Sequence, residues 1–553
     1  MSYYSSMEFK IRRYLKITMK DGINLIGDFY FPDSSPPYPA VVFRTPYGRD
    51  DPQYRKNARF FASNAFAFLN LDVRGRGDSE GKFIPYLNEG RDGKEIIDWV
   101  ANQSWSNGKV GTFGGSYSAR IQWLTALEHP MNLKAMISRV SPSDPFLESP
   151  TGVSDPMHIS WRYLVSGRTA KSVDDIDWMS VYRTLPLIDM PKALGLVFDD
   201  WEEGMMHQTF DSYWDAISYQ KKFGGIGLPV MHISGWYDDE QIGTFINYAG
   251  MRNCSATSKS RENQSIIIGL WGHNVNSLSK LGDVDFGPEA IIDLDTIQLN
   301  WFKKWLMDEN INAGKRAKVF IMGENKWVNF NDWPPSRTTS SNLFLSSRGR
   351  ANSRFGDGAL VWPKDDINYG YDSYRYDPSD PTPFVTNSTS AQIGGPDDYS
   401  SIHRRDDVLV YMSQPLEKNI TFLGAIRADI FMETDVPDTD IMAMLLDVWP
   451  NGRSQRLCDG VTRARYRNGM DKVELLEKGN IYDIKVDLWN TGYRFQQGHR
   501  IGFSVQSAAF PKYSRNLNTG KDLATDTTMK TASTKVIHTK EHPSNFSFYL
   551  YRD

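Results

Sequence analysis

The chain has 553 residues, of which 40% are hydrophobic, 24% are charged and 13% are aromatic. This composition is typical of a globular protein with a large core, and the length predicts two or three domains rather than one. The formal net charge of -4 gives no electrostatic reason to expect a nucleic acid or an anionic membrane as a partner.

The N-terminal segment and the cysteines bear on location. The first residues, "MSYYSSMEFKIRRYLKITMKDG", lack the apolar segment of a signal peptide, and no apolar run is long enough to span a bilayer. The two cysteines, Cys254 and Cys458, form neither a disulfide framework nor a metal cluster, and they suit a reducing compartment. We therefore expect a cytoplasmic protein without membrane association.

The first part of the chain alternates apolar strand-like runs with helical patterns. The runs begin at Ala40, Phe66, Lys109, Ala135, Pro229 and Ser265. Continuous apolar strands of this kind predict a parallel sheet covered by helices on both faces. Asp92 and Glu95 are spaced as a capping box for the helix "GKEIIDWVANQ", and a long helix is predicted in "PEAIIDLDTIQLNWFKKWLMD". An α/β domain is thus expected over residues 1–144 and 229–316.

Residues 145–228 interrupt this α/β pattern. They contain four tryptophans and two segments of helical pattern, "SVDDIDWMSVYRTL" and "FDSYWDAISYQKKF". An insertion at the carboxyl edge of a parallel sheet covers the crevice where such sheets bind ligands. We therefore expect a helical cap over a binding site.

The chain changes character at about residue 317. Short alternating strands such as "KVFIMGENKWV" and "DIMAMLLDVWP" follow one another with turns rich in Gly, Pro, Asn and Asp, and almost no helix is predicted. This pattern indicates a C-terminal all-β sandwich or jelly roll over residues 317–553.

The stretch "GTFGGSYSAR" (111–120) reads as a strand, a tight turn and a helix. Such a turn needs small neighbours, and it is the setting of a nucleophile elbow, in which a serine hydroxyl stands exposed at the top of a sheet. The candidate nucleophile is Ser116. The pattern departs from G-x-S-x-G because Ser118 occupies the last position, so a glycine-rich packing turn with a solvated serine is the alternative.

Two later residues complete a possible triad. Asp238 follows the strand "PVMHISG" and His273 follows "SIIIGLW", in the Ser, Asp, His order of α/β-hydrolases. Each residue alone could equally serve a turn. Together, in order and each beyond a strand, they indicate a serine hydrolase, whereas His232 lies inside its strand and is expected to be a core residue.

At this point the chain resembles the cocaine-esterase-like (CocE/NonD) hydrolases, a family that includes X-Pro dipeptidyl peptidases and α-amino acid ester hydrolases. The resemblance rests on "RTPYGRDD", "LDVRGRGDSEGKF", "WSNGKVGTFGGSYSA", "SGWYDDEQ" and "GLWGHN", and in the β domain on "PDTDIMAMLLDVWPNGRSQRLCDGVTRARYR" and "FPKYSRNLNTG". It implies a hydrolase core, a helical cap and a C-terminal jelly roll of galactose-binding-like type. It also implies the triad Ser116, Asp238 and His273, and an oxyanion hole formed by the Tyr47 hydroxyl and the Tyr117 N–H.

The expected activity is cleavage of small carboxylic esters or amides through an acyl-enzyme, without a cofactor or a metal ion. X-Pro dipeptidyl peptidase and α-amino acid ester hydrolase activities are the main alternatives. A different class, a carbohydrate- or partner-binding protein with a vestigial hydrolase domain, also remains open. The oligomeric state is not predicted.

Acidic residues beside the triad raise the question of an ammonium site. The resemblance matches Glu240, and loosely Asp155 in the cap, to carboxylates that receive a substrate ammonium. Asp239 and Glu240 could instead begin the helix "EQIGTFINYAGM", and this helix-start role is the favoured interpretation.

Two further motifs are discounted. The Arg76-Gly77-Asp78 tripeptide lies after a core strand and is not expected to act in adhesion. Turn and strand-end roles explain the clustered aspartates more simply than calcium does, and these are Asp435, Asp438 and Asp440.

Overall fold

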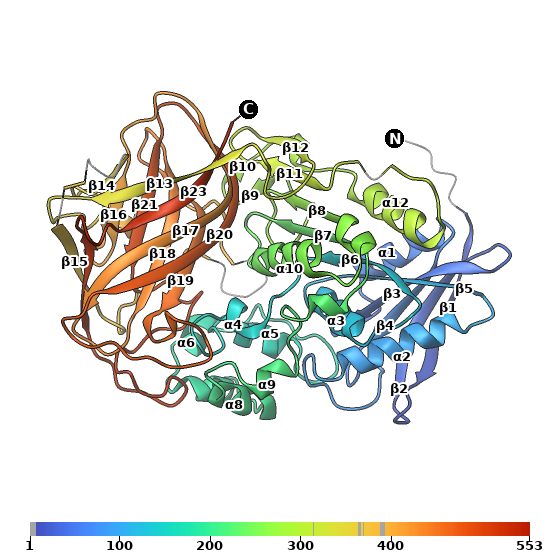
Figure 1. Cartoon of the computed structure of the whole chain (residues 1–553). Coiled ribbons are helices and arrows are strands. Elements are labelled where there is room, and N and C mark those ends of the chain that lie inside the picture. The colour runs from blue at the N-terminus through green and yellow to red at the C-terminus, as the bar shows by residue number, and fades with distance from the viewer. Residues whose placement is uncertain (1–6, 313, 363–366, 369, 387–392, 553) are drawn as a thin grey trace.

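The computed structural model describes residues 7–312, 314–362, 367–368, 370–386 and 393–552. A parallel-sheet domain and an all-β domain lie beside each other, and the short helices of the insertion lie below and between them (Figure 1). Residues 1–6 and 553, which the predicted domain ranges include, lie outside the described residues.

The first sheet contains ten strands in the order β1-β2-β4-β3-β5-β6-β7-β8-β11-β12. Neighbours from β4 to β11 are parallel, whereas β1, β2 and β12 pair antiparallel at the edges. The central strands are buried along their whole length, as the apolar runs predicted. The strands span Phe9–Thr18 (β1), Asn24–Pro32 (β2), Tyr38–Thr45 (β3), Ala67–Asp72 (β4), Ser106–Gly115 (β5), Leu133–Arg139 (β6), Val230–Gly235 (β7), Gln264–Gly269 (β8), Ala317–Ile321 (β11) and Lys326–Phe330 (β12).

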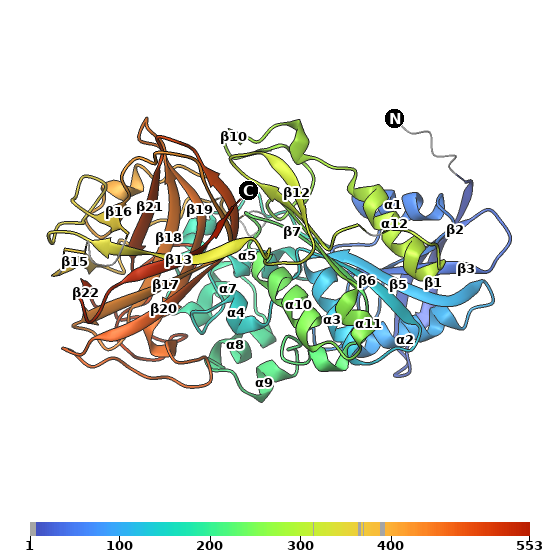
Figure 2. The same ribbon diagram turned by 45° about the horizontal axis from the view of Figure 1, so that its top comes forward.

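Helices cover both faces of this sheet (Figure 2). On one face, Phe61 and Phe302 pack edge-on against each other in a cluster with the strand residue Phe113. On the other face, Ile97 and Trp123 join a second apolar cluster. The helices span Pro52–Ala62 (α1), Glu89–Ala101 (α2), Tyr117–Leu127 (α3), Gln241–Cys254 (α10), Ser258–Glu262 (α11) and Leu294–Leu306 (α12).

The capping box expected at Asp92 is wrong. Helix α2 already begins at Glu89, so Asp92 lies within it. The Asp92 carboxylate is buried and accepts two hydrogen bonds from Arg74, at 2.8 and 2.7 Å. A tertiary ion pair therefore explains this aspartate, which local spacing had assigned to a cap.

The first two strands after the boundary expected at residue 317 pair with the first sheet. Strand β11 pairs parallel with β8, and β12 pairs antiparallel with β11, so both extend the first sheet. The edge of a sheet offers unpaired backbone groups, and a hairpin that follows α12 directly satisfies them. The strands of the second sheet begin with β13 at Thr338.

The insertion is helical but its helices are shorter than predicted. Helix α6 begins after Asp177, whose side chain accepts a hydrogen bond from the Ser180 N–H, and α9 begins after Asp211 in the same way. None of the described helices is long and apolar enough to cross a membrane. The helices span Pro145–Glu148 (α4), His158–Leu164 (α5), Trp178–Tyr182 (α6), Met190–Ala193 (α7), Asp199–Met206 (α8) and Ser212–Asp215 (α9).

The C-terminal domain is all-β, with eleven described strands in one hydrogen-bonded network. The longest strand, β17, pairs with three others, β20, β22 and β23. The strands span Thr338–Ser346 (β13), Ala359–Val361 (β14), Gly370–Tyr376 (β15), Leu409–Met412 (β16), Ile420–Thr434 (β17), Asp440–Val448 (β18), Ser454–Arg463 (β19), Tyr482–Phe495 (β20), Arg500–Gln506 (β21), Ala532–His538 (β22) and Asn545–Tyr551 (β23).

A buried ion pair fastens the insertion to the β domain. Arg463 is fully buried and donates two hydrogen bonds to Asp440, each at 2.9 Å. It also donates to the carbonyl oxygens of Thr151, in the insertion, and Ser514. The expectation that the clustered aspartates serve turns and strand ends is therefore incomplete, because Asp440 and its neighbour Asp438 hold buried arginines.

We expect Arg463→Met to lower the melting temperature markedly, because it leaves the buried Asp440 carboxylate without its cation. Breaking such a pair costs about 3–5 kcal/mol. The control is Arg427→Met, which removes an exposed arginine 3.5 Å from Asp487 and should change stability by less than ~0.5 kcal/mol. Differential scanning calorimetry of both variants checks this, and similar melting temperatures for the two would contradict it.

Candidate active site

Ser116 lies at the sharp turn between β5 and α3, as the sequence predicted. Its backbone is in a left-handed conformation, with φ 58° and ψ -131°, which non-glycine residues rarely adopt. The Ser116 N–H donates to the carbonyl oxygens of Arg139 and Val140, at 3.0 and 3.1 Å. These bonds hold the turn against the neighbouring strand, so the strained serine is fixed in place.

Gly114, two residues before Ser116, explains how Ser118 fits where the usual motif has glycine. A Cβ atom at Gly114 would lie 2.7 Å from the Ser118 Cβ, closer than such atoms approach. The Ser118 side chain thus uses the space that Gly114 leaves open. Ser118 can therefore replace the usual last glycine of the motif, because Gly114 in β5 has no side chain that would collide with it.

Asp238 and His273 come together at the ends of β7 and β8. The His273 Nδ1 lies 3.0 Å from an Asp238 carboxylate oxygen. The buried Asp238 also accepts hydrogen bonds from the Ser234 hydroxyl, at 2.5 Å, and the Glu240 N–H, at 3.3 Å. With Nδ1 engaged by the carboxylate, the other ring nitrogen of His273 is the one that can accept a proton.

Tyr47 follows β3 and its hydroxyl lies within hydrogen-bonding range of the Ser116 side chain. The indole N–H of Trp161, from the insertion, donates to the Tyr47 hydroxyl oxygen at 3.0 Å. Burial raises the pKa of the Tyr47 hydroxyl, so the group stays protonated at neutral pH. Its own proton is therefore free to point toward the reacting atoms.

Arg76 supports the turn that carries Tyr47. Its guanidinium donates to the carbonyl oxygens of Pro46 and Val165, both at 2.7 Å, and the side chain is fully buried. Arg76 of the Arg76-Gly77-Asp78 tripeptide is thus held inside the fold although Asp78 is exposed, and the burial of Arg76 is in line with the rejection of an adhesion role.

Tyr117 presents only its backbone to the site. Its hydroxyl donates to Glu89 at 2.7 Å and accepts from the Tyr86 N–H at 3.2 Å, well inside the protein. As the first residue of α3, it has an N–H without an intrahelical partner. That N–H is at the positive end of the helix dipole, next to Ser116.

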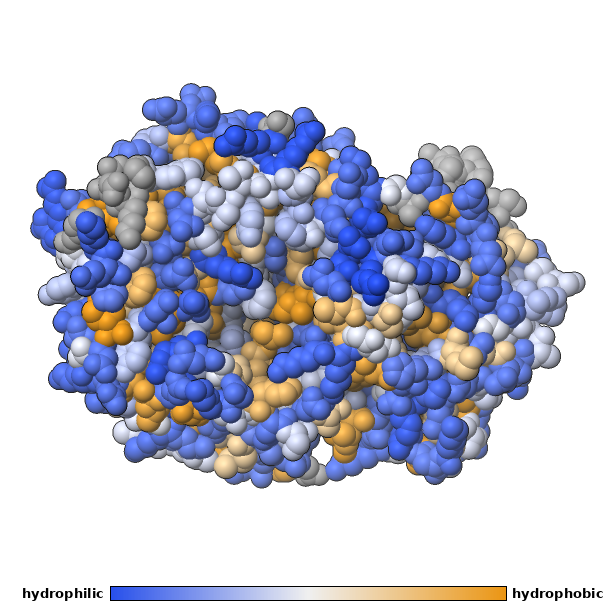
Figure 3. Space-filling model, viewed as in Figure 1, coloured by the Kyte–Doolittle hydropathy of each residue, from blue (hydrophilic) through white to orange (hydrophobic). Residues whose placement is uncertain are grey.

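One pocket of about 1080 Å³ is lined by Tyr47, Ser116, Tyr117, Asp238 and His273. All three parts of the chain contribute to it, including Trp161 of the insertion and Lys512 of the β domain. Apolar side chains gather near the middle of the face shown in Figure 3, between the two halves of the molecule. A ligand in this pocket would be enclosed by the catalytic domain, the insertion and the β domain together.

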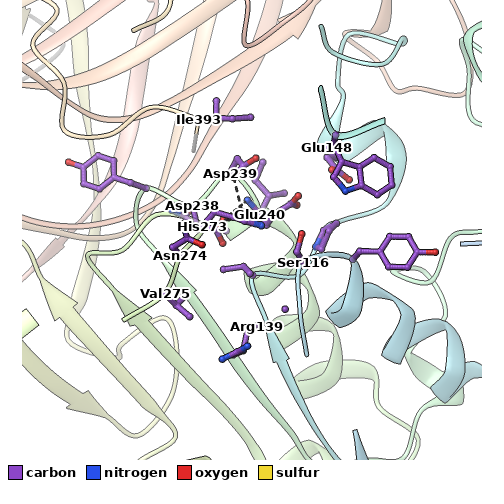
Figure 4. A pocket seen from close by; sticks show the side chains of 18 of the residues that line it. Ser116, Arg139, Glu148, Asp238, Asp239, Glu240, His273, Asn274, Val275 and Ile393 are labelled. Atoms are coloured by element: carbon purple, nitrogen blue, oxygen red, sulfur yellow. Dashed lines mark hydrogen bonds and ion pairs between the residues drawn. The ribbon is translucent and has the colours of Figure 1, made fainter. Parts of the chain in front are cut away.

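The other carboxyl groups that line this pocket include Glu148, Asp239 and Glu240 (Figure 4). The carboxyl groups of Glu148 and Glu240 hydrogen-bond each other. Glu148 lies 3.8 Å from Arg120, and Asp239 lies 3.8 Å from His273. Among the described residues, no cation lies within ion-pair distance of Glu240.

The crowding of these acids changes their ionisation. Burial raises the pKa of Glu148 to about 7 and that of Asp239 to about 6. Burial, and then the charges of Glu148 and Asp239, raise the pKa of Glu240 well above its usual value. Burial disfavours the charged form of His273, but Asp238 and the other acids outweigh it and raise the His273 pKa to about 9.

Glu240 stands at the start of α10, where the favoured interpretation placed it, but its side chain does not cap the helix. Glu240 is the N-cap residue of α10, yet its side chain makes no cap hydrogen bond, and it is only 8% exposed. Asp155 lines the pocket, but it accepts hydrogen bonds from Thr151 and the Ser514 N–H at the contact with the β domain. Glu148 is the insertion residue that reaches Glu240.

The geometry of the site also bears on metal binding. Ligand atoms of Asp238, Asp239 and His273 lie within 4.8 Å of one another. The His273 Nδ1 and the Asp238 carboxylate already bind each other, so an ion there would displace the contact that orients the imidazole. These residues fit a catalytic dyad with a nearby acid better than a metal site.

Sequence reasoning missed several residues of this site. Trp161 and Glu148 lie in the insertion, where no strand or motif fixes the alignment. The available signal for Glu148 was its place shortly after β6, which pairs with β5, the strand that leads to Ser116. His232, by contrast, is buried in β7 and hydrogen-bonds Gln264, as expected of a core residue.

Comparison with known proteins relates the whole chain to enzymes. Residues 21–275 match the model of the X-Pro dipeptidyl-peptidase (S15) family, and residues 310–546 match the X-Pro dipeptidyl-peptidase C-terminal non-catalytic domain. Cocaine esterase of Rhodococcus sp. is 30% identical over 97% of this chain and 98% of its own.

Two solved structures share the fold. An aminopeptidase from a marine sediment archaeon (Thaumarchaeota) has a TM-score of 0.87 at 21% identity, covering 99% of this chain and 97% of its own. An α-amino acid ester hydrolase has a TM-score of 0.86 at 22% identity, covering 100% and 98%. The matches cover almost the whole chain, and the structure contains the serine at the sharp turn and the Asp–His pair. We conclude that the chain is a serine hydrolase and belongs to the cocaine-esterase-like (CocE/NonD) family.

Proposed function

We propose that Ser116, His273 and Asp238 form the catalytic triad of an acyl hydrolase. The Ser116 hydroxyl oxygen attacks the substrate carbonyl carbon while the His273 Nε2 takes its proton. His273 then passes that proton to the leaving oxygen or nitrogen, and the acyl group remains on Ser116. Water, deprotonated by His273, attacks the ester carbon, and the carboxylic acid and the serine are released.

We further propose that the Tyr47 hydroxyl and the Tyr117 N–H stabilise the oxyanion. Preorganised donors aimed at the developing charge lower the barrier without reorganising during the reaction. The Trp161 indole supports this role, because its N–H donates to the Tyr47 hydroxyl oxygen. The hydroxyl proton of Tyr47 is then left to donate to the oxyanion. The observation that carries the whole proposal is the 3.0 Å contact between His273 and Asp238 in the pocket of the strained Ser116.

For the substrate, we propose an ester or amide of an α-amino acid with a free ammonium group. The support is the set of three carboxyl groups, Glu148, Asp239 and Glu240, in the pocket. Burying a carboxylate without a cation is costly, and a substrate ammonium would supply the positive charge that Glu240 lacks among the described residues. It would also offset the negative charge that holds a proton on His273, which must be neutral to act as a base.

Neutral aryl and alkyl esters remain the simpler alternative, and X-Pro dipeptide amides, which also carry an ammonium, are a third. A paired assay separates them: an alanine nitrophenyl ester, the propionate ester of the same phenol, and a Gly-Pro anilide. The family membership favours all of these over a carbohydrate-binding protein with a vestigial hydrolase domain.

We also propose that the all-β domain is a jelly roll of galactose-binding-like type, and that the enzyme works in the cytoplasm. The second proposal is supported by the two cysteines, Cys254 and Cys458, which are both unpaired.

Ser116→Ala should abolish labelling by a fluorophosphonate probe, because the probe needs the serine oxygen. Labelling of Ser116→Ala equal to that of the wild type would exclude the triad.

Tyr47→Phe should lower kcat about 10²–10³-fold with little change in KM, since the hydroxyl acts only on the transition state. Tyr163→Phe, in the same insertion helix as Trp161, is the matched control and should retain activity. Steady-state kinetics on a nitrophenyl ester checks the Tyr47→Phe and Tyr163→Phe variants.

Glu240→Gln and Glu148→Gln should each raise KM for the alanine nitrophenyl ester about tenfold or more, because each removes a charge-assisted contact to the ammonium. KM for the propionate ester, which lacks the ammonium, should change little. Asp155→Asn should affect both esters equally, since its carboxyl already binds Thr151 and Ser514. Equal effects of Glu240→Gln on the two esters would remove the ammonium site.

The preference for the alanine ester over the propionate ester should rise between about pH 5.5 and 7.5. Asp239 and Glu148 have pKa values raised to about 6 and about 7, so both gain negative charge over this range. Above about pH 8 the substrate amine loses its proton, and the preference should fall again. The ratio of kcat/KM for the two esters is the measurement, because titration of His273 affects both. A ratio independent of pH would contradict the proposal.

A further inference from the structure

Arg139 is a charged residue of the pocket that the proposed mechanism does not use. It is the last residue of β6, and its carbonyl oxygen accepts the Ser116 N–H at 3.0 Å. Its side chain lines the pocket, and its guanidinium lies over the ring of Phe113, 4.5 Å from the centroid. The cation is thus close in the fold to the nucleophile.

The guanidinium of Arg139 has no anionic partner among the described residues. No carboxylate there lies within ion-pair distance of it, and its buried Nε makes no hydrogen bond. The charged or titratable groups nearest to it are Tyr54 and Asp295. Burial raises the pKa of Tyr54, which is therefore neutral at pH 7, and Asp295 is exposed to solvent.

The other largely buried lysine and arginine residues that line the pocket have an anionic partner, because Arg456 and Lys512 both bind Asp459. Lys56 also lines the pocket, but it is exposed and its charge is solvated. A desolvated cation without a partner is costly, and the face of the Phe113 ring offsets only part of that cost. Arginine keeps its charge even where burial lowers its pKa, as it does here. Arg139 therefore has unused donors in a ligand pocket.

Arg139 lies on the other side of the reaction centre from the acids. In Figure 4, Ser116 and His273 lie between the carboxyl groups of Glu148 and Glu240 and the Arg139 guanidinium. Val275, two residues after His273, lies on the Arg139 side. The histidine that protonates the leaving group thus borders the part of the pocket that contains the free cation.

We propose that Arg139 is the anion-binding residue of a leaving-group subsite, and that this subsite takes a carboxylate. The planar guanidinium can offer two parallel N–H donors, which match the two oxygens of a carboxylate. Together with the ammonium site, this deepens the proposed function: the substrate class is a zwitterion, with its ammonium on the acyl side of the scissile bond and its carboxylate on the leaving side.

Binding of a leaving-group mimic tests the subsite without any turnover. Titration calorimetry compares 3-hydroxybenzoate with 3-hydroxybenzamide, which have the same shape and differ in charge. The wild-type enzyme should bind the benzoate at least tenfold more tightly, and Arg139→Met should lose that preference, whereas Arg139→Lys should retain part of it. Lys512→Met, which removes another pocket cation, is the matched control and should keep the preference.

Turnover separates this inference from the proposed function on which it rests. The substrates are butyrate esters of the same two phenols, which carry no ammonium. Arg139→Met should raise KM for the carboxylate ester about tenfold and leave the carboxamide ester within about twofold. Equal binding of the two mimics by the wild type, or a preference that survives in Arg139→Met, would overturn the subsite. Selective binding without hydrolysis of either butyrate ester or of the alanine nitrophenyl ester would keep the subsite and reject the acyl hydrolase proposal.

Discussion

The backbone strain at Ser116 is the constraint on which the rest of the site depends. An L-residue with φ 58° and ψ -131° persists only where its surroundings leave no alternative. Here the neighbouring strand supplies two carbonyl acceptors for its N–H, and the space at Gly114 lets α3 approach β5. The turn exposes the serine hydroxyl and leaves the Tyr117 N–H beside it at the start of the helix. One local conformation thus positions both the candidate nucleophile and a candidate oxyanion donor.

The second organising feature is the charge enclosed by three parts of the chain. The carboxyl ends of β7 and β8 bring Asp238 and His273 together, and the segment after β7 adds Asp239 and Glu240. The insertion adds Glu148, and the β domain adds Lys512. Because these groups are close together and largely buried, each alters the ionisation of the others, as the raised pKa values of Glu148 and His273 illustrate. The β domain and the insertion are therefore part of the electrostatics of the site as well as its walls.

Buried arginines connect these parts. Arg463 joins the β domain to the Thr151 carbonyl of the insertion, and Arg76 joins the Tyr47 turn to the insertion at Val165. Each guanidinium has several donors in a fixed plane, so one side chain can satisfy backbone groups from different segments. Such contacts are invisible in the sequence, because the partners are separated by many residues and share no pattern.

The sequence by itself determined the features that arise from local pattern and order. Apolar runs predicted the buried parallel strands, small residues around Ser116 predicted the tight turn, and positions just beyond strands singled out Asp238 and His273. These signals are reliable because burial and backbone geometry act on neighbouring residues. The same locality explains the errors: Asp92 has the spacing of a cap but pairs with Arg74, and strand β11 looks like the start of a β domain but completes the first sheet.

Only the tertiary structure decided which charged residues meet. Glu240 sits at a helix start in the sequence, yet in the fold its carboxyl reaches Glu148 across the pocket. Arg139 ends an ordinary strand, yet in the fold its guanidinium lies in the pocket without a counter-ion among the described residues. The physical reason is that the energy of a charge depends on its distance from every other charge and on the water it has lost, and folding sets both quantities between residues far apart in the chain.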